Sequence, residues 1–249
     1  MNDNLDDYTP ELTPWEQHAG HWVKRDDLYC WAGVRGGKTR TCRALSNGAT
    51  GGLVTAGARE SPQINIVAHV AARLGLPCRA HCPEGRLGAE LLAAQQLGAE
   101  IVQWPAGRCC VLRARARADA FLRGWREIPF GMECPEAVRQ TARQVANIPQ
   151  DVRRLVVPVG SGMSLAGILH GLSGAVKVLG VVVGADPTRR LARYAPWQWR
   201  WRCELRRAPW PYDKRIKARL GDLELDPIYE AKCLPFLEPA DALWVVGIR

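Results

Sequence analysis

Hydrophobic positions in the middle of the chain alternate between helical and strand-like spacing. Residues 64–74 carry apolar side chains at helical spacing and end at Gly75, a residue type that commonly stops helices, and the short strand-like segment 76–83 follows. The same order then repeats, with a helix over 87–97 that is again stopped by a glycine and a strand over 100–104. Helices that take turns with strands are typical of parallel sheets, so the pattern predicts an α/β fold.

The same pattern continues towards the C-terminus. Apolar spacing predicts further helices over 111–125 and 135–145, and the second begins with proline, which suits a first helical turn. Buried strands are predicted over 153–159, 175–183 and 242–247. All the apolar runs are interrupted far short of the roughly 20 residues that a membrane helix needs, so we expect no segment that crosses a bilayer.

Composition and charge narrow the class of protein. The chain has 249 residues, 47% hydrophobic and 24% charged, which is enough apolar sequence for a sizeable core and excludes disordered and fibrous proteins. A formal net charge of +9 favours anionic partners, whether phosphate, carboxylate or nucleic acid. The acidic, polar N-terminus lacks the pattern of a secretory signal, so we expect a cytoplasmic protein whose nine cysteines are free thiols. No paired CxxC clusters occur, and we therefore expect no metal site.

Tryptophan and arginine are interleaved within residues 189–219. The part WQWRWR alternates between the two residue types, so we expect a strand with one aromatic and one cationic face. Such a surface suits nucleic acid, because bases stack on aromatic rings and arginines bind phosphates. The other interpretation is a solvated cationic face over a tryptophan-filled seam between domains or subunits. The residues that would bind nucleic acid are Arg200 and Arg202 with the neighbouring Trp197, Trp199, Trp201 and Trp210.

A lysine follows two glycines in the segment VRGGKTR. Lys38 stands at what looks like a helix start, where the positive end of the helix dipole favours an uncharged, nucleophilic amine that can form a Schiff base. The rival interpretation is a nucleotide-binding P-loop. The sequence disfavours it, because the earlier glycine of that motif is missing at the required offset.

A second glycine-rich turn, GSGMSLAG at residues 160–167, lies between a predicted strand and a predicted helix. This arrangement presents several backbone N–H groups to one anion, and Ser161 and Ser164 can add hydroxyl donors. A dinucleotide site fits poorly, because the acidic residue expected about 20 positions later would be Asp186, beyond the next strand. The sequence therefore predicts a phosphate cup.

Seven short segments occur in the same order as in one family of enzymes. They are LTPW, VKRDDL, GGKTR, TAGARESPQ, IPFGM, VPVGSGMSLAG and LDPIYEAK, and they extend from Leu12 to Lys232. On these segments the chain resembles the pyridoxal-phosphate enzymes of the 1-aminocyclopropane-1-carboxylate (ACC) deaminase and D-cysteine desulfhydrase group, within the tryptophan synthase β superfamily. The chain is shorter than usual for that family.

The resemblance implies roles for individual residues. Lys38 falls on the family's Schiff-base lysine, and Tyr229 falls on the tyrosine that reaches the reacting substrate. Ser61 falls in the loop that faces the substrate carboxylate, which implies a catalytic and substrate-binding role. Glu230 follows the tyrosine as in the ACC deaminases, so we expect it to contact substrate. The residues implied to bind the cofactor, pyridoxal 5′-phosphate, are Lys38, Gln63, Gly160, Ser161, Gly162, Met163 and Ser164.

The resemblance also implies an architecture. It is the two-domain fold type II of pyridoxal-phosphate enzymes, with parallel twisted sheets, a smaller inserted α/β domain and the cofactor between the domains. We expect a large cofactor-binding domain over 1–48 and 124–249 and a small inserted domain over 49–123, with a glycine-rich hinge at 48–52. The family implies a homodimer.

Three positions depart from the family pattern. Gly37 stands where the family has asparagine before its lysine. Pro62 replaces a residue whose side-chain amide bonds the cofactor's ring oxygen, and proline has neither a side-chain amide nor an N–H. Met163 replaces a glycine of the phosphate turn. These changes indicate an altered cofactor pocket and a specialised substrate.

Three hypotheses about function follow. The leading one is a pyridoxal-phosphate-dependent lyase or deaminase that acts on an amino acid or amino-acid-like amine through a lysine aldimine. The second keeps the cofactor and places the amino-acid group on a nucleic-acid base, as in viral DNA hypermodification, and the positive charge and the Trp and Arg segment favour it. The third is a noncatalytic basic binding protein on the same scaffold.

Overall fold

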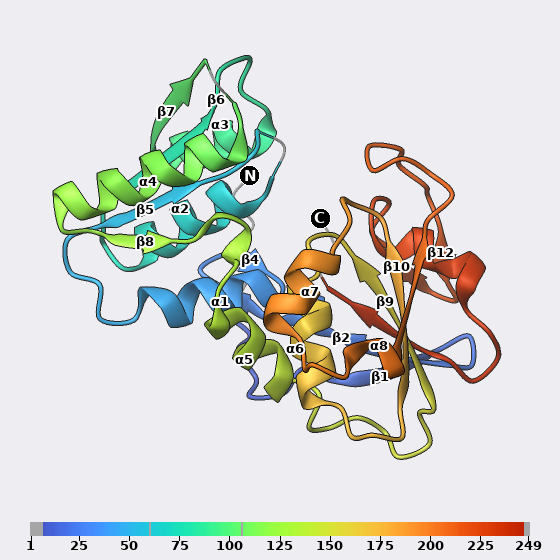
Figure 1. The fold of residues 1–249 in the computed structure, drawn as a ribbon. Helices are drawn as coiled ribbons and strands as arrows, with labels where there is room; N and C mark the ends of the chain where they lie inside the picture. The colour runs from blue at the N-terminus through green and yellow to red at the C-terminus, as the bar shows by residue number, and fades with distance from the viewer. Residues whose placement is uncertain (1–6, 60, 106, 247–249) are drawn as a thin grey trace. The chain divides into compact units, whose positions relative to one another are not determined.

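The computed structural model describes residues 7–59, 61–105 and 107–246, and the chain forms two compact units (Figure 1). Unit 1 takes in residues 1–7, 30–34 and 38–136, and unit 2 takes in residues 8–29, 35–37 and 137–249, in each case as far as they are described. The small domain predicted over 49–123 lies within unit 1. The unit is longer at both ends, because Cys42 before this range and Ile128 and Met132 after it belong to its hydrophobic core.

Unit 1 contains a parallel sheet of four strands in the order β7-β6-β5-β8. The strands are β5 (Leu53–Ala56), β6 (Cys78–Pro83), β7 (Glu100–Trp104) and β8 (Arg126–Ile128). The helices are α1 (Gly37–Ser46), which begins at the boundary of the unit, α2 (Gln63–Arg73), α3 (Ala89–Gln96) and α4 (Cys109–Arg123), with the 3-10 helix η2 (Phe130–Met132). Each of α2, α3 and α4 connects two parallel strands, as the right-handed crossovers of such sheets require.

Both faces of this sheet are covered by helices. Leu53 of β5 belongs to a core formed with α2 and α3, whereas Val54 and Ala56 belong to a second core formed with Leu112 and Ala116 of α4. Neighbouring side chains of a strand point to opposite faces, so one strand supplies both cores. Strands buried on both faces are typical of parallel sheets, and the predicted α/β class is confirmed.

Unit 2 contains a sheet of six strands in the order β1-β2-β14-β9-β10-β11. The strands are β1 (Trp15–His18), β2 (His21–Arg25), β14 (Ala242–Val245), β9 (Arg154–Val159), β10 (Lys177–Val182) and β11 (Cys203–Arg207). Only the β1–β2 hairpin is antiparallel within this sheet. The helices are α5 (Pro135–Arg143), which begins at the boundary, α6 (Met163–Gly171), α7 (Thr188–Tyr194) and α8 (Trp199–Arg202).

Several short elements complete the chain. Unit 2 also contains the 3-10 helices η1 (Asp26–Leu28) and η3 (Glu230–Phe236). Two short two-stranded sheets pair β3 (Cys30–Trp31) with β4 (Val34–Arg35) and β12 (Arg219–Leu220) with β13 (Leu223–Glu224). Across the described ranges, no helix combines the length and the apolar character that a bilayer span requires.

The predicted elements agree with the structure within a few residues. The helices expected over 64–74, 87–97, 111–125 and 135–145 are α2 to α5, and the strands expected over 76–83, 100–104, 153–159 and 175–183 are β6, β7, β9 and β10. The last strand, expected over 242–247, is β14, and residue 247 lies outside the described residues. These segments have strong periodicity and clear stops, which is why they could be predicted.

The expected strand in WQWRWR is wrong. Residues 199–202 form the short helix α8, and pairing with β10 begins only at Cys203, which lies opposite Val178. Two hydrogen bonds close turns in this segment before β11 begins. They run from Trp199 N–H to the Pro196 carbonyl (2.9 Å) and from Trp201 N–H to the Gln198 carbonyl (3.0 Å). Alternating residue types therefore do not predict a strand where the backbone N–H and carbonyl groups are satisfied by hydrogen bonds within local turns.

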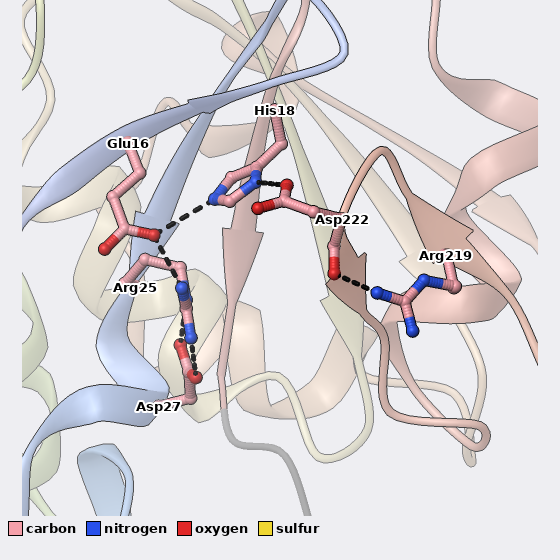
Figure 2. Close-up of polar contacts among 6 residues, drawn as sticks. All are labelled: Glu16, His18, Arg25, Asp27, Arg219 and Asp222. Atoms are coloured by element: carbon pink, nitrogen blue, oxygen red, sulfur yellow. Dashed lines mark hydrogen bonds and ion pairs between the residues drawn. The ribbon is translucent and has the colours of Figure 1, made fainter.

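A chain of charged groups joins the β1–β2 hairpin to the turn between β12 and β13 (Figure 2). The His18 ring lies between two carboxylates, with Nε2 3.0 Å from Glu16 Oε2 and Nδ1 2.7 Å from Asp222 Oδ1. The Arg25 guanidinium contacts Glu16 at 2.5 Å and Asp27 at 2.9 Å. Two carboxylates facing both ring nitrogens favour the doubly protonated imidazolium.

These ion pairs make one pH-dependent contribution to stability. Burial alone would lower the pKa of His18, but hydrogen bonds and charge from Glu16 and Asp222 outweigh it, and the pKa of His18 lies above its ordinary value. A raised folded-state pKa gives stability that is present below the unfolded value of 6.5 and is lost as the pH rises through the folded value. We expect His18→Gln to destabilise the protein more at pH 6 than at pH 9.

Urea unfolding at the two pH values measures this difference. The matched control is His170→Gln, because the His170 ring contacts only a backbone oxygen, that of Tyr194 at 2.9 Å, and no carboxylate among the residues described. A loss of stability for His18→Gln that is equal at both pH values would show that the imidazolium does not contribute.

Candidate active site

The predicted phosphate turn is the connection between β9 and α6. The strand is buried up to Val159, and the chain then turns through Gly160, Ser161 and Gly162 into the helix. Gly162 precedes the helix with φ of +91°, and a Cβ atom there would lie 2.9 Å from the Pro187 side chain. Glycine is required at this position for both reasons. The first helical bond, from Ala166 N–H to the Gly162 carbonyl at 2.9 Å, leaves the preceding N–H groups outside the helical hydrogen-bond pattern.

The chemistry of this turn suits a phosphate group. Its donors are backbone N–H groups at the positive end of α6 and the hydroxyls of Ser161 and Ser164, both half-buried, and residues 160–164 include no acid. The Met163 side chain is buried, so this residue can offer only its backbone to an anion. The residues present therefore fit the phosphate of the cofactor that the sequence implies.

Tyr229 packs against the phosphate turn. A Cβ atom on Gly160 would lie 2.9 Å from Tyr229 Cε1 and 3.2 Å from its hydroxyl, so only glycine permits this approach. The Asp226 carboxylate accepts hydrogen bonds from the N–H groups of Ile228 (2.8 Å) and Tyr229 (2.9 Å) and holds the backbone before η3. The structure thus brings one predicted catalytic residue to the predicted phosphate-binding residues.

A second tyrosine lies beside the first. The Tyr212 hydroxyl is 3.1 Å from the Tyr229 hydroxyl, and the two rings meet edge to face at 6.0 Å. The fully buried Lys232 holds this loop, because its ammonium donates to the carbonyls of Pro211 (2.7 Å) and Tyr212 (2.9 Å). Tyr212 is not among the residues predicted for the site. In the sequence, Tyr212 is marked only as an aromatic residue after a proline. Its neighbour in space, Tyr229, is 17 positions further along the chain.

Glu230 is fully buried beside the Asp226 turn. Its Oε1 accepts a hydrogen bond from Val246 N–H at 2.8 Å, and its Oε2 has no partner within the described part of the chain. Burial, followed by the nearby charge of Asp226, raises the pKa of Glu230 well above its ordinary value. The neutral carboxyl is therefore favoured, and a protonated oxygen can donate a hydrogen bond. Its predicted contact with substrate stays a prediction.

Lys38 differs from the other five lysines in its surroundings. Lys24 and Lys232 are fully buried, and each ammonium donates to backbone or side-chain oxygens at 2.7–2.9 Å. The remaining lysines, at positions 177, 214 and 217, are exposed. Lys38 is half-buried at the second position of α1, directly after Gly37. A reactive amine needs both partial desolvation and access, and among the lysines only Lys38 combines them.

The predicted substrate loop lies between β5 and α2. The Ser61 hydroxyl accepts a hydrogen bond from Gln63 N–H at 3.3 Å, as a residue at a helix start commonly does. The Gln63 side chain is buried and engaged, because its amide nitrogen donates to Thr55, Ala56 and Pro129 and its oxygen accepts from Gly131 N–H at 2.5 Å. These bonds tie α2 to β5 and to the segment after β8, a structural role. Among the described residues the amide oxygen accepts only this one bond and has a second lone pair, so the predicted cofactor contact of Gln63 stays a prediction.

The described residues hold no group of three or more His, Cys, Asp or Glu side chains that could bind a metal ion. All nine cysteines are free, and seven of them are at least partly buried. Burial raises the pKa of the Cys42 thiol to about 12, so this cysteine of α1 is unreactive at neutral pH.

Comparison with solved structures finds the same fold in several other proteins. An ACC deaminase homologue superposes with a TM-score of 0.77 at 24% identity, over 96% of this chain and 90% of the other. The diaminopropionate ammonia lyase of Escherichia coli gives 0.64 at 13% identity, over 98% and 84%. Isoform 2 of threonine deaminase from Solanum lycopersicum gives 0.56 at 16% identity, over 97% and 66%. A search of the curated proteins found no match.

The sequence comparison decides the family. Residues 18–213 match the family described as pyridoxal-phosphate dependent enzymes, a range that includes Lys38, Ser61 and the phosphate turn. This match confirms the resemblance, the cofactor class and the enzymatic nature of the scaffold, and the structural neighbours confirm the fold. The chain belongs to the pyridoxal-phosphate-dependent enzyme family.

Proposed function

We propose that the protein is a pyridoxal-phosphate-dependent lyase or deaminase that acts on the amino group of an amino acid or amino-acid-like amine. The observation that supports this most directly is the contact of Tyr229 with Gly160, because it puts a hydroxyl group next to the turn suited to the cofactor's phosphate. A tyrosine hydroxyl that lies next to the bound cofactor can hold or move a proton on the substrate.

Each residue has a defined task in this proposal. Residues 160–164 would hold the cofactor's phosphate through N–H and hydroxyl groups, and Lys38 would hold its aldehyde carbon before substrate binds. When bound, the cofactor accepts the electron pair released as a bond at the substrate's α-carbon breaks. Once the substrate amine has replaced it on the aldehyde carbon, the Lys38 amine would be free to move a proton at the substrate's α-carbon, and Ser61 would bind the substrate carboxylate. Gln63 would contact the cofactor only through the second lone pair of its amide oxygen, because its other polar atoms bond the protein.

Release of ammonia together with a 2-oxo acid tests the proposal. The purified protein is loaded with pyridoxal 5′-phosphate, and a panel of small amino acids of both configurations is supplied, with ammonia and oxo acid measured separately. We expect turnover of at least one member and visible absorbance from the bound cofactor. A protein that stays colourless after loading would contradict the proposal, and one that binds the cofactor without any turnover would favour the noncatalytic alternative.

The two tyrosines are expected to contribute unequally. Tyr229→Phe removes the proposed proton-carrying hydroxyl, so we expect kcat to fall on the order of 10²-fold or more while the cofactor still binds. Tyr212→Phe removes only the hydrogen bond that orients it, and we expect about a fivefold decrease with a shifted pH profile of kcat. The control is Tyr8→Phe, since Tyr8 is exposed. Equal effects of the two site variants would contradict the division of roles.

A second candidate substrate is an amino-acid group carried on a nucleic-acid base. It keeps the same cofactor and the same residues. One observation favours it, the exposure of two tryptophans in an arginine-rich segment of unit 2. The assay is the same, with an amine-bearing oligonucleotide in place of the free amino acid, and absence of any change in the oligonucleotide would exclude this candidate.

A further inference from the structure

Two tryptophan side chains of unit 2 are exposed to solvent. Trp197 is 78% exposed and Trp201 is 70% exposed, whereas the other eight tryptophans are buried or half-buried. Exposed indole rings leave a large apolar area in water, which free proteins generally avoid. Tryptophan is also the residue type that contributes most at binding surfaces. The pair therefore indicates a surface that a partner covers.

The two rings are held in a defined arrangement. Their centroids are 5.3 Å apart and the planes are inclined at 71°, an edge-to-face contact. Between them in sequence, Trp199 is buried and anchors α8 in the unit. The Arg202 guanidinium donates to the carbonyls of Leu172 and Ser173 and fixes the end of the helix. A platform formed before binding loses little conformational entropy when a ligand stacks on it.

The segment that carries the rings has only positive charges. Residues 187–203 include five arginines and no acidic residue. The Arg200 guanidinium lies over the Trp199 ring at 4.5 Å, and the Lys177 ammonium donates to the Trp201 carbonyl at 3.4 Å. Arg200 and Lys177 are both exposed, so their charges face solvent next to the exposed rings. A partner for this surface is anionic and aromatic.

Single-stranded nucleic acid combines these two properties. Bases stack on indole faces and the phosphates between them bind cations, without any need for sequence-specific contacts. A lipid surface fits less well, because an interfacial helix buries a continuous apolar face in the membrane, and residues 187–203 expose only Trp197 and Trp201 among the large hydrophobic residues. The other strongly exposed apolar pair, Phe121 and Leu122, belongs to α4 of unit 1.

We infer that the surface formed by Trp197, Trp201, Arg200 and Lys177 binds single-stranded nucleic acid. Bases stack on the two indole rings, and the two exposed cations bind the adjacent phosphates. Arg202 is not part of the contact, contrary to the expectation from sequence, because its guanidinium is engaged with backbone carbonyls. This surface goes beyond the proposed reaction and does not depend on it.

Binding of a labelled oligothymidylate of about 12 nucleotides tests the inference, since one such strand fills a typical single-strand site. Fluorescence anisotropy is measured with the cofactor-loaded, full-length protein over a range of salt concentrations. We expect log affinity to fall with log salt with a slope of about −1.4, because two phosphate contacts are proposed. Trp197→Ala and Trp201→Ala are each expected to weaken binding about tenfold.

Matched variants separate stacking from charge and from folding. Arg200→Gln is expected to reduce the steepness of the salt dependence by about 0.7, because one phosphate contact is lost. Phe121→Ala, an equally exposed aromatic residue of unit 1, is expected to leave binding unchanged. The visible absorbance of bound cofactor reports folding of every variant and is independent of DNA.

Three outcomes would overturn the inference. They are no binding at low salt, equal binding by the wild type and the Trp197→Ala/Trp201→Ala double variant, and preferential binding to vesicles that contain anionic phospholipid. Loss of cofactor absorbance with intact oligonucleotide binding would instead contradict the proposed function alone.

Discussion

Lys38→Ala is expected to abolish covalent attachment of the cofactor and to lower turnover on the order of 10³-fold or more, because both the attachment point and the proton carrier are removed. The fold should persist. Lys38 is half-buried at the second position of α1, and alanine is the residue most compatible with a helix. Reduction of the loaded protein with borohydride followed by peptide mass analysis should place the cofactor on the peptide that contains Lys38.

The matched control is Lys217→Ala, which removes an exposed lysine of unit 2. We expect this variant to keep the wild-type absorbance and turnover. A reduced cofactor adduct on any other lysine, or turnover by Lys38→Ala close to that of the wild type, would contradict the assignment. Far-ultraviolet circular dichroism of both variants distinguishes loss of attachment from loss of folding.

Gly167→Ala is expected to destabilise the protein by about 2–3 kcal/mol, the usual cost of forcing a methyl group into a close-packed core. Gly167 lies on α6 where it crosses α5. An added Cβ atom would lie 2.5 Å from Thr141 Cβ and 2.9 Å from the Val138 carbonyl oxygen. The second contact is with backbone, so the helices must move apart. Gly171, one turn later, would meet the Ala142 carbonyl in the same way.

The expected effect extends to cofactor binding, because α6 begins directly after the turn at 160–162 and a shift of the helix would displace that turn. Urea unfolding measures the loss of stability, and titration of visible absorbance measures a raised dissociation constant for pyridoxal 5′-phosphate. Gly174→Ala is the control, since nothing lies within 4 Å of its added Cβ atom. Equal stability of the two variants would show that the α5–α6 contact relaxes without cost.

Much of the fold could be predicted because its elements have strong periodicity. The helix over 64–74 and the strand over 100–104 have apolar spacing that matches α2 and β7 closely. By contrast, the sequence did not indicate β1, β2 or β8. These strands are three to five residues long, and their residues become strands only through pairing with distant partners.

The candidate site divides in the same way. Lys38 and the turn at 160–164 carry local signals, since glycine before a helix start is visible in any sequence. The roles of Ser61, Tyr229 and Glu230 came from resemblance and not from spacing, and they stay predictions. Tyr212 and the engagement of Gln63 could not be predicted, because both depend on hydrogen bonds between segments far apart in the chain.

The α/β class, the glycine-rich turn at 160–164 and the family could be read from the sequence, because helical period, glycine position and motif order are local or linear properties. The remaining features depend on how distant segments pack. Packing placed Tyr229 against Gly160, buried Glu230 beside Asp226, wound residues 199–202 into the helix α8 and left Trp197 and Trp201 exposed. Burial and partnership depend on which distant residues meet, and no single stretch of the chain contains that information.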